Sequence, residues 1–386
     1  MLRRYSHTRP FAFDFDTGPP YSWNTPRVAR SALLTVRAAR LFWAILSVVS
    51  CLFFPGGGSA AAPADSDRRA VEEATELFRA GEIDAAIVAL RKATESGTSS
   101  AEAYHLLGQM YFKGKKKPQD AVEAYTHALK LKPVYPDALN DLAEVYVAQG
   151  KTAEAEQTLK RAIEVAPKRE ESYVNLARLY ESRHDVPAAI NTYQRLLTVR
   201  PTSADGLFGL AILHEGQGNN KSARELLARL TKANPAHADG WYQAGRLAER
   251  SNDLLEAAYA YRQAIAAKPN LVDAHYNLGF ILRSQNKPAE AEKEFLEVIR
   301  YRPEYAEAHM NLGVVYTSMN KLEEAEREYE RAVALKPDYA EAHYNLGVFY
   351  ELHRKDMPRA LAQYHKYRNL GGRDDRVERI IGTAGR

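Results

Sequence analysis

The 386 residues include 53 Lys and Arg, 49 Asp and Glu and one cysteine. Seven Arg and two Asp lie in residues 1–64, a net charge of +5, which leaves 46 basic and 47 acidic residues downstream. A nearly neutral folded part lacks the basic surface that nucleic acids require, so we expect no nucleic-acid partner. Because the one cysteine is Cys51, residues 65–386 can form no disulfide and offer no thiolate for metal binding or catalysis.

The N-terminal segment has the pattern of an export signal. Residues 41–54, LFWAILSVVSCLFF, form an uncharged apolar run that follows several arginines and precedes a stretch rich in Gly, Ala and Ser. This order of basic, apolar and small residues is typical of a secretory signal. We therefore interpret residues 1–64 as a leader, and we expect the protein to be exported and to be periplasmic or associated with the envelope.

Two alternatives remain open for this leader. The apolar run is shorter than the ~20 residues that span a bilayer, but the Gly and Ala that follow could extend it into an uncleaved membrane anchor. The four residues that end at Cys51 resemble a bacterial lipoprotein box, in which the cysteine would be acylated. Residues 52–54 continue the apolar run and favour Cys51 as a small residue of the signal core. Any membrane association is therefore expected through residues 41–54 or Cys51.

The rest of the chain repeats at a constant interval. Prolines recur with identical spacing at Pro133, Pro167, Pro201, Pro235, Pro269, Pro303 and Pro337. Alanines keep this spacing, apart from a slightly longer final step, at Ala121, Ala155, Ala189, Ala223, Ala257, Ala291, Ala325 and Ala360. A third column holds only Gly or Ala, at Gly108, Ala143, Ala177, Ala211, Gly245, Gly279, Gly313 and Gly347. These columns indicate helical hairpins, because small residues let two helices approach and proline ends the second one.

The pattern of small residue, aromatic, Ala and Pro at this interval resembles the tetratricopeptide repeat family, whose unit is about 34 residues long, in an exported bacterial form. Segments such as AHYNLGFIL and AHMNLGVVY match it closely. The resemblance implies an all-α, right-handed superhelical solenoid of helical hairpins. We expect a degenerate first unit at residues 67–100, eight units at residues 101–372 and a capping segment at residues 373–386.

The sequence also predicts where the helices turn. Gly150, Gly218 and Asn320 stand between the two helices of a unit, and such residues end a helix at low cost. Two units carry one extra residue, after Gly114 and after His353. We expect both inserts to bulge from the turn of their hairpin.

The sequence contains no recognisable catalytic chemistry. It has no Gly-rich phosphate loop after a strand and no nucleophile elbow, so we expect neither enzymatic activity nor a cofactor. His275, His309 and His343 recur at the interval of the prolines. Equivalent points of packed helices lie about 8–10 Å apart, whereas zinc holds its nitrogens at about 2.1 Å. We therefore expect no metal site and interpret these histidines as bulky residues of the first helices.

An acidic residue occupies the second position of every full unit, at Glu102, Asp137, Glu171, Asp205, Asp239, Asp273, Glu307 and Glu341. A carboxylate in the first turn of a helix is stabilised by the helix dipole. That local role accounts for the column; a stripe for a basic partner is the alternative.

The candidate binding residues lie on the first helices, which in the resembling family line the inner, concave face. Asn277, Asn311 and Asn345 occupy the sixth position of the last three first helices, and Asn175 belongs to the same column. They resemble the asparagine ladder with which the sugar-transferring members hold an extended peptide, since one Asn amide can donate and accept at once. Apolar contact and charge selectivity are expected from Tyr242, Tyr276, Met310, Tyr344, Arg283 and Glu351.

These observations predict a non-catalytic scaffold or adaptor of the cell envelope that holds an extended peptide or a partner protein on its concave surface. The alternative is a pilotin-like or lipid-anchored structural assembly factor for an envelope complex, which would use its outer surface or its lipid. The identity of the protein partner is not encoded in any recognisable motif.

Overall fold

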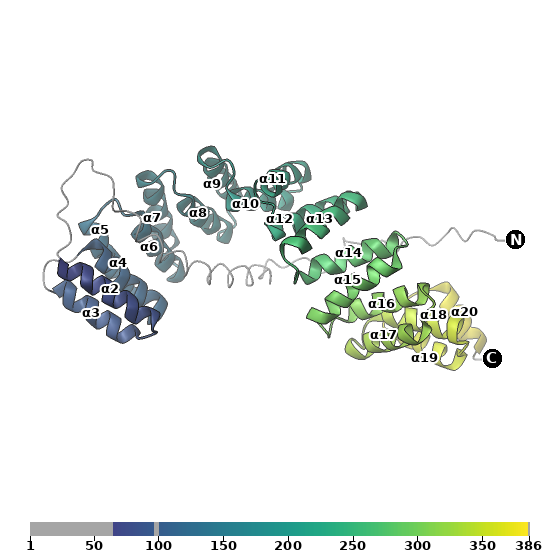
Figure 1. Ribbon diagram of the computed structural model, residues 1–386. Coiled ribbons are helices and arrows are strands. Elements are labelled where there is room, and N and C mark those ends of the chain that lie inside the picture. Colours follow the sequence, from purple (N-terminus) through teal and green to yellow (C-terminus); the bar gives the residue numbers. More distant parts are fainter. Residues whose placement is uncertain (1–64, 96–99, 385–386) are drawn as a thin grey trace. The chain divides into compact units, whose positions relative to one another are not determined.

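The computed structural model describes residues 65–95 and 100–384, and in these ranges every regular element is helical (Figure 1). The first half contains α2 (Asp65–Arg79), α3 (Ile83–Glu95), α4 (Ala101–Gln109), η1 (Met110–Gly114), α5 (Pro118–Leu131), α6 (Pro136–Ala148), α7 (Thr152–Val165), α8 (Glu170–Ser182), α9 (Val186–Val199), α10 (Ala204–Gly216) and α11 (Asn220–Ala233). The second half contains α12 (Ala238–Arg250), α13 (Leu254–Ala267), α14 (Val272–Ser284), α15 (Pro288–Tyr301), α16 (Ala306–Ser318), α17 (Leu322–Leu335), α18 (Ala340–Phe349), η2 (Tyr350–Arg354), α19 (Met357–Asn369) and α20 (Asp375–Ala384).

Consecutive helices pack in pairs, from α2 with α3 to α18 with α19, and each pair packs on the next. The prediction of an all-α solenoid of helical hairpins is confirmed. The predicted leader, with its apolar run and Cys51, lies outside the described residues. Within the described ranges, no helix combines the length and the apolar character that a membrane crossing requires.

The columns of small residues hold each hairpin together. All eight alanines of the second helices are fully buried. In the first helices, a methyl group added to Gly245 would lie 2.6 Å from the ring of Tyr261, and one added to Gly313 would lie 2.7 Å from that of Tyr329. The glycine therefore makes room for the aromatic ring of the second helix, in addition to letting the two backbones approach.

The predicted helix ends are confirmed. Gly150, Gly218 and Asn320 have φ angles of 72°, 77° and 59°, the left-handed conformation that ends a helix. Each second helix ends two residues before its proline; α13, for example, ends at Ala267 before Pro269.

The prediction of bulging loops at the two inserts was wrong. The extra residue is accommodated within the first helix, whose last turn is π-helical, η1 in one unit and η2 in the other. At the end of η1, the Lys115 N–H donates to the Met110 carbonyl five residues earlier, at 3.0 Å. A wider turn absorbs one residue without breaking the helical hydrogen bonding, so the insert changes the end of the first helix and not the loop alone.

Aromatic and apolar side chains join neighbouring hairpins. The Tyr180 hydroxyl donates to Glu156 of the preceding unit at 3.0 Å, and Tyr350 does the same to Glu330 at 2.8 Å. At the C-terminal end, α20 packs the buried Val377 against the last hairpin. These contacts join α8 to α7, η2 to α17 and α20 to the last hairpin.

Candidate functional site

The candidate site consists of side chains at the fifth, sixth and twelfth positions of the last three first helices. We call this set the C-terminal face: Tyr276, Asn277, Arg283, Met310, Asn311, Tyr344, Asn345 and Glu351. The two other candidates, Asn175 in α8 and Tyr242 in α12, occupy the same positions in earlier units. The hydrogen bonds of these side chains determine which of them can reach a partner.

Asn311 is the most enclosed of the asparagines, with 1% of its surface exposed. Its amide nitrogen donates to the Tyr276 hydroxyl at 3.1 Å and to the Glu307 carbonyl at 2.8 Å. Its amide oxygen accepts a hydrogen bond from the guanidinium of Arg283. Both N–H groups of the amide are thus used inside the protein, and Asn311 positions Arg283.

Asn277 and Asn345 are partly buried and each contacts the preceding unit. The Asn277 amide donates to the Tyr261 hydroxyl at 3.1 Å, and the Asn345 amide to the sulfur of Met310 at 3.2 Å. Asn175 is also partly buried, three units away from Asn277. The asparagines therefore share one column but differ in exposure, and Asn277 and Asn345 are the more accessible members of the C-terminal face.

Arg283 is the cation of this face. Its guanidinium carbon lies 4.8 Å from the centre of the Phe280 ring, one turn earlier on α14. Burial lowers the pKa of Arg283 from its usual value, because desolvation disfavours the charged form. The side chain is thus held between an aromatic ring and the amide of Asn311.

Arg283 differs from comparable arginines in its charge partners. Five arginines of the described residues are partly buried, and four of these have a carboxylate oxygen within 4.0 Å: Arg169, Arg246, Arg354 and Arg376. Arg283 forms no such ion pair with any described residue. A cation removed from water without a counter-ion is costly, so this site favours a negatively charged group.

Glu351 has a different environment. It accepts hydrogen bonds from the Tyr364 hydroxyl and from the Arg376 guanidinium, the latter at 2.6 Å, so α20 partly covers it. Glu249 at the equivalent position accepts from Tyr261 at 2.7 Å. Glutamate at the twelfth position thus pairs with a tyrosine of the second helix in these units.

Arg283 replaces such a glutamate in its unit, and sequence reasoning missed this difference. In the unit of Arg283, the equivalent second-helix residue is Phe295, which has no hydroxyl to donate. The signal was present in the sequence: Glu249 and Glu351 occur with Tyr261 and Tyr364, whereas Arg283 occurs with Phe295.

The aromatic candidates are partly buried and packed against other aromatic rings. The Tyr276 ring lies 5.2 Å from that of Tyr305, and the Tyr344 ring lies 5.2 Å from that of Tyr367. Met310 is buried. Burial raises the pKa of Tyr242 to about 12, so its hydroxyl is neutral and available as a donor at neutral pH. These residues provide packed apolar surface beside the asparagines of the C-terminal face.

The three repeated histidines are structural. His275 lies between Glu294, at 2.6 Å from Nδ1, and the Pro269 carbonyl, at 2.9 Å from Nε2. His309 makes the same two contacts with Glu328 and Pro303. Among the described residues, no cluster of three or more His, Cys, Asp or Glu could hold a metal ion.

The acidic column also has partners that sequence reasoning missed. Glu102 pairs with Lys132, and Glu307 with Lys336, each at 2.8 Å. Both lysines immediately precede a repeat proline, so a basic residue at that position was the available signal. Part of the acidic stripe is therefore neutralised within the protein.

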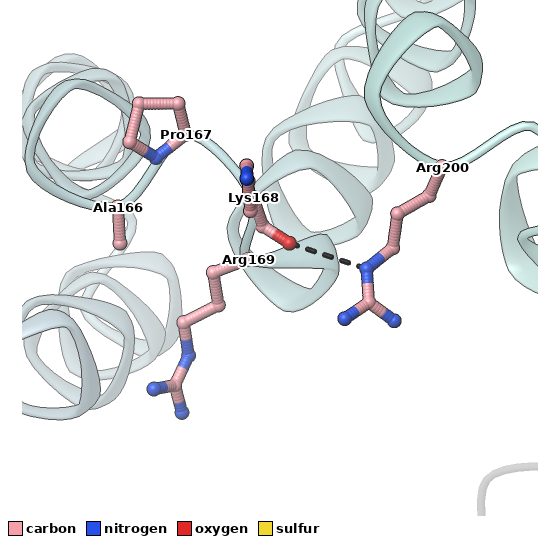
Figure 2. A pocket seen from close by; sticks show the side chains of 5 residues that line it. All are labelled: Ala166, Pro167, Lys168, Arg169 and Arg200. Carbon is pink, nitrogen blue, oxygen red and sulfur yellow. Dashed lines mark hydrogen bonds between the residues drawn. The ribbon is translucent and has the colours of Figure 1, made fainter.

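A shallow basic pocket lies at the junction of two units (Figure 2). It is lined by Ala166, Pro167, Lys168, Arg169 and Arg200. Arg200 donates through Nε to the Lys168 carbonyl at 3.2 Å and lies 3.4 Å from Glu170, while Arg169 pairs with Asp137. Because both arginines already have carboxylate partners, this pocket is a weaker candidate than the C-terminal face.

Comparison with family models finds tetratricopeptide repeats along most of the chain. The model of the cytochrome c-type biogenesis protein H TPR domain matches residues 60–206. Models described as tetratricopeptide or TPR repeats match residues 208–272, 260–293 and 315–353. No curated protein sequence matches the chain.

Several solved structures are similar to parts of this chain. YrrB, described as a TPR protein with an unusual peptide-binding site, is 23% identical, with a TM-score of 0.43, over 48% of this chain and 95% of its own. MamA from Desulfovibrio magneticus RS-1 is 21% identical, with a TM-score of 0.41, over 44% and 94%. PilF from Pseudomonas aeruginosa is 15% identical, with a TM-score of 0.46, over 56% and 96%.

Proposed function

Because the chain belongs to the tetratricopeptide repeat family, we propose that it is a non-catalytic protein-binding scaffold that holds an extended segment of a partner on the C-terminal face. The repeat fold supports a protein-interaction role. The observation that carries the proposal is a set of partly exposed polar groups on two first helices of the array, Asn277 and Arg283 on α14 and Asn345 on α18.

Hydrogen bonds to the partner's backbone would supply only part of the affinity. Asn277 and Asn345 can each pair with a peptide N–H and C=O, and each bond contributes about 0.5–1.5 kcal/mol. Association costs about 4–15 kcal/mol, which such bonds alone do not offset. Apolar contact with Tyr276 and Tyr344 and a charge interaction at Arg283 are therefore part of the proposal.

The proposed location is the cell envelope, reached by export through the leader. It is supported by the order of basic, apolar and small residues around residues 41–54. Mass spectrometry of the mature chain from its native cells distinguishes the alternatives. A start between residues 60 and 66 would support cleavage, acylation at Cys51 would indicate a lipid anchor, and an intact leader recovered with membranes would indicate an uncleaved anchor.

A second candidate function uses the outer surface. On α13, Leu255 and Tyr259 are 78% and 55% exposed, and the Tyr259 ring contacts that of Trp241 edge-on at 5.8 Å. Exposed apolar side chains one turn apart on a second helix favour a protein contact there. They are the observation in favour of a structural assembly factor, pilotin-like or lipid-anchored, in an envelope complex.

Quantitative capture with two matched variants separates the candidates. One variant carries Asn277→Ala and Asn345→Ala, and the other carries Leu255→Ala and Tyr259→Ala. We expect the full chain and the second variant to retain the same envelope proteins, and the first variant to lose them while its circular dichroism stays unchanged. Loss only in the second variant would move the function to the outer surface.

A further inference from the structure

We propose that Arg283 binds the side-chain carboxylate of an Asp or Glu within the segment held on the C-terminal face. The inference rests on the proposed function and adds the chemistry by which a partner is selected. It predicts that partners share an acidic residue at one fixed place in an otherwise variable extended segment.

The guanidinium is fixed before any partner binds. Asn311 accepts from one N–H, and the Phe280 ring lies against the planar group at 4.8 Å. Asn311 is itself held by the Tyr276 hydroxyl and by the Glu307 carbonyl. A guanidinium has five N–H donors in a rigid fork, so further donors remain for a carboxylate. Holding the fork in advance lowers the entropy that binding must offset.

No group of the described residues neutralises this cation at close range. Glu341 attracts Arg283 but forms no ion pair with it within 4.0 Å. Burial raises the pKa values of the Tyr276 and Tyr339 phenols far above neutrality, so these neighbours carry no charge. A bound carboxylate would supply the counter-charge that the partly buried Arg283 lacks among the described residues.

The surrounding residues favour a carboxylate inside the segment over one at its C-terminus. Asn277 is on the same helix as Arg283, and Asn345 is two units further along the array. A segment that contacts both asparagines continues past Arg283 and does not end there. Arg283 is also the only basic residue of the C-terminal face.

Selection from displayed peptides tests the proposal with the full chain. Short random peptides are presented in two libraries, one anchored at both ends and one with a free C-terminus. The baits are the natural protein, Arg283→Glu and the control Arg300→Glu, which changes an exposed arginine on the second helix α15. We expect the natural protein and the control to enrich the same internal Asp or Glu, and Arg283→Glu to enrich Lys or Arg at that place.

The affinity of a selected peptide then gives the size of the contribution from Arg283. Changing its acidic residue to the amide should weaken binding to the natural protein about tenfold or more, as for a charge-assisted hydrogen bond, and should not weaken binding to Arg283→Gln. Three outcomes would overturn the Arg283 inference alone. The enriched peptides could show no preference for Asp or Glu, or a preference that Arg283→Glu leaves unchanged. The preference could also be confined to peptides with a free C-terminus. Failure of the natural protein to enrich any peptide would overturn the proposed function as well.

Discussion

His275 occupies a site with two hydrogen-bond acceptors, the carboxylate of Glu294 and the carbonyl of Pro269. A neutral imidazole has only one N–H, so both contacts are satisfied when the ring is protonated. Burial opposes the charge, but the hydrogen bonds that the ring donates to the Glu294 carboxylate and to the Pro269 carbonyl outweigh it and raise the pKa of His275. Glu297 adds a smaller attraction of the same sign.

The raised pKa predicts how stability depends on pH. The folded pKa lies above the unfolded value of about 6.5, so the stabilisation is complete below that pH and is lost as pH rises through the folded pKa. Glu294→Gln should remove it, and Gln363 beside His343 shows that an amide fits the equivalent place. Melting temperatures over this range should show the natural protein's advantage over the variant shrinking as pH rises.

The control is Glu290→Gln on the same helix as Glu294, which removes a carboxylate from an exposed ion pair with Arg262 of α13. Its difference from the natural protein should stay constant over the same pH range. An advantage over Glu294→Gln that did not change with pH would show that His275 keeps one protonation state throughout.

Within one helical hairpin, the buried alanine column sets how closely the two helices pack. Ala257 is fully buried in α13, beside Gly245 and Tyr261. Ala257→Leu should therefore cost about 1–3 kcal/mol through overpacking. Because repeat stability passes between nearest neighbours, hydrogen exchange should accelerate in α12 to α15 and remain unchanged in α4 to α7.

The matched control is Ala266→Leu, which adds the same side chain at an exposed position of the same helix. It should leave both regions unchanged. Equal exchange in the natural protein and Ala257→Leu would mean that the hairpin accommodates the larger residue without separating its helices.

The helices and turns were predictable where they depend on the sequence pattern within one repeat. The constant interval of the prolines predicted a series of helical hairpins. Gly150, Gly218 and Asn320 marked turns, because a residue in the left-handed conformation ends a helix. The π-helical turn at residues 110–114 was not predictable from the extra residue, since a loop and a wider helical turn accommodate it equally well in the sequence.

The sequence predicted which repeat positions form the candidate site, but not which side chains contact one another there. Asn277 and Asn311 share one repeat position, yet Asn311 is buried because Tyr276 and Arg283 of the preceding unit both reach it. Such contacts depend on residues 28 and 35 positions away. A pattern within one unit does not contain them.

Two surfaces of the whole array are candidates for binding the partner. The first helices carry Arg283 and the asparagines, and the second helix α13 carries Leu255 and Tyr259. A photo-reactive residue on each surface reports which one touches another protein in living cells. Phe280 on α14 and Tyr259 on α13 are suitable sites, because both are aromatic and exposed, at 39% and 55%.

Photo-crosslinking from these two positions therefore shows which surface binds the partner. With p-benzoylphenylalanine placed at one position at a time in the full chain, illumination of native cells should join a partner protein to position 280 and not to position 259. Crosslinks from position 259 with none from position 280 would contradict the account and assign the interaction to the outer surface.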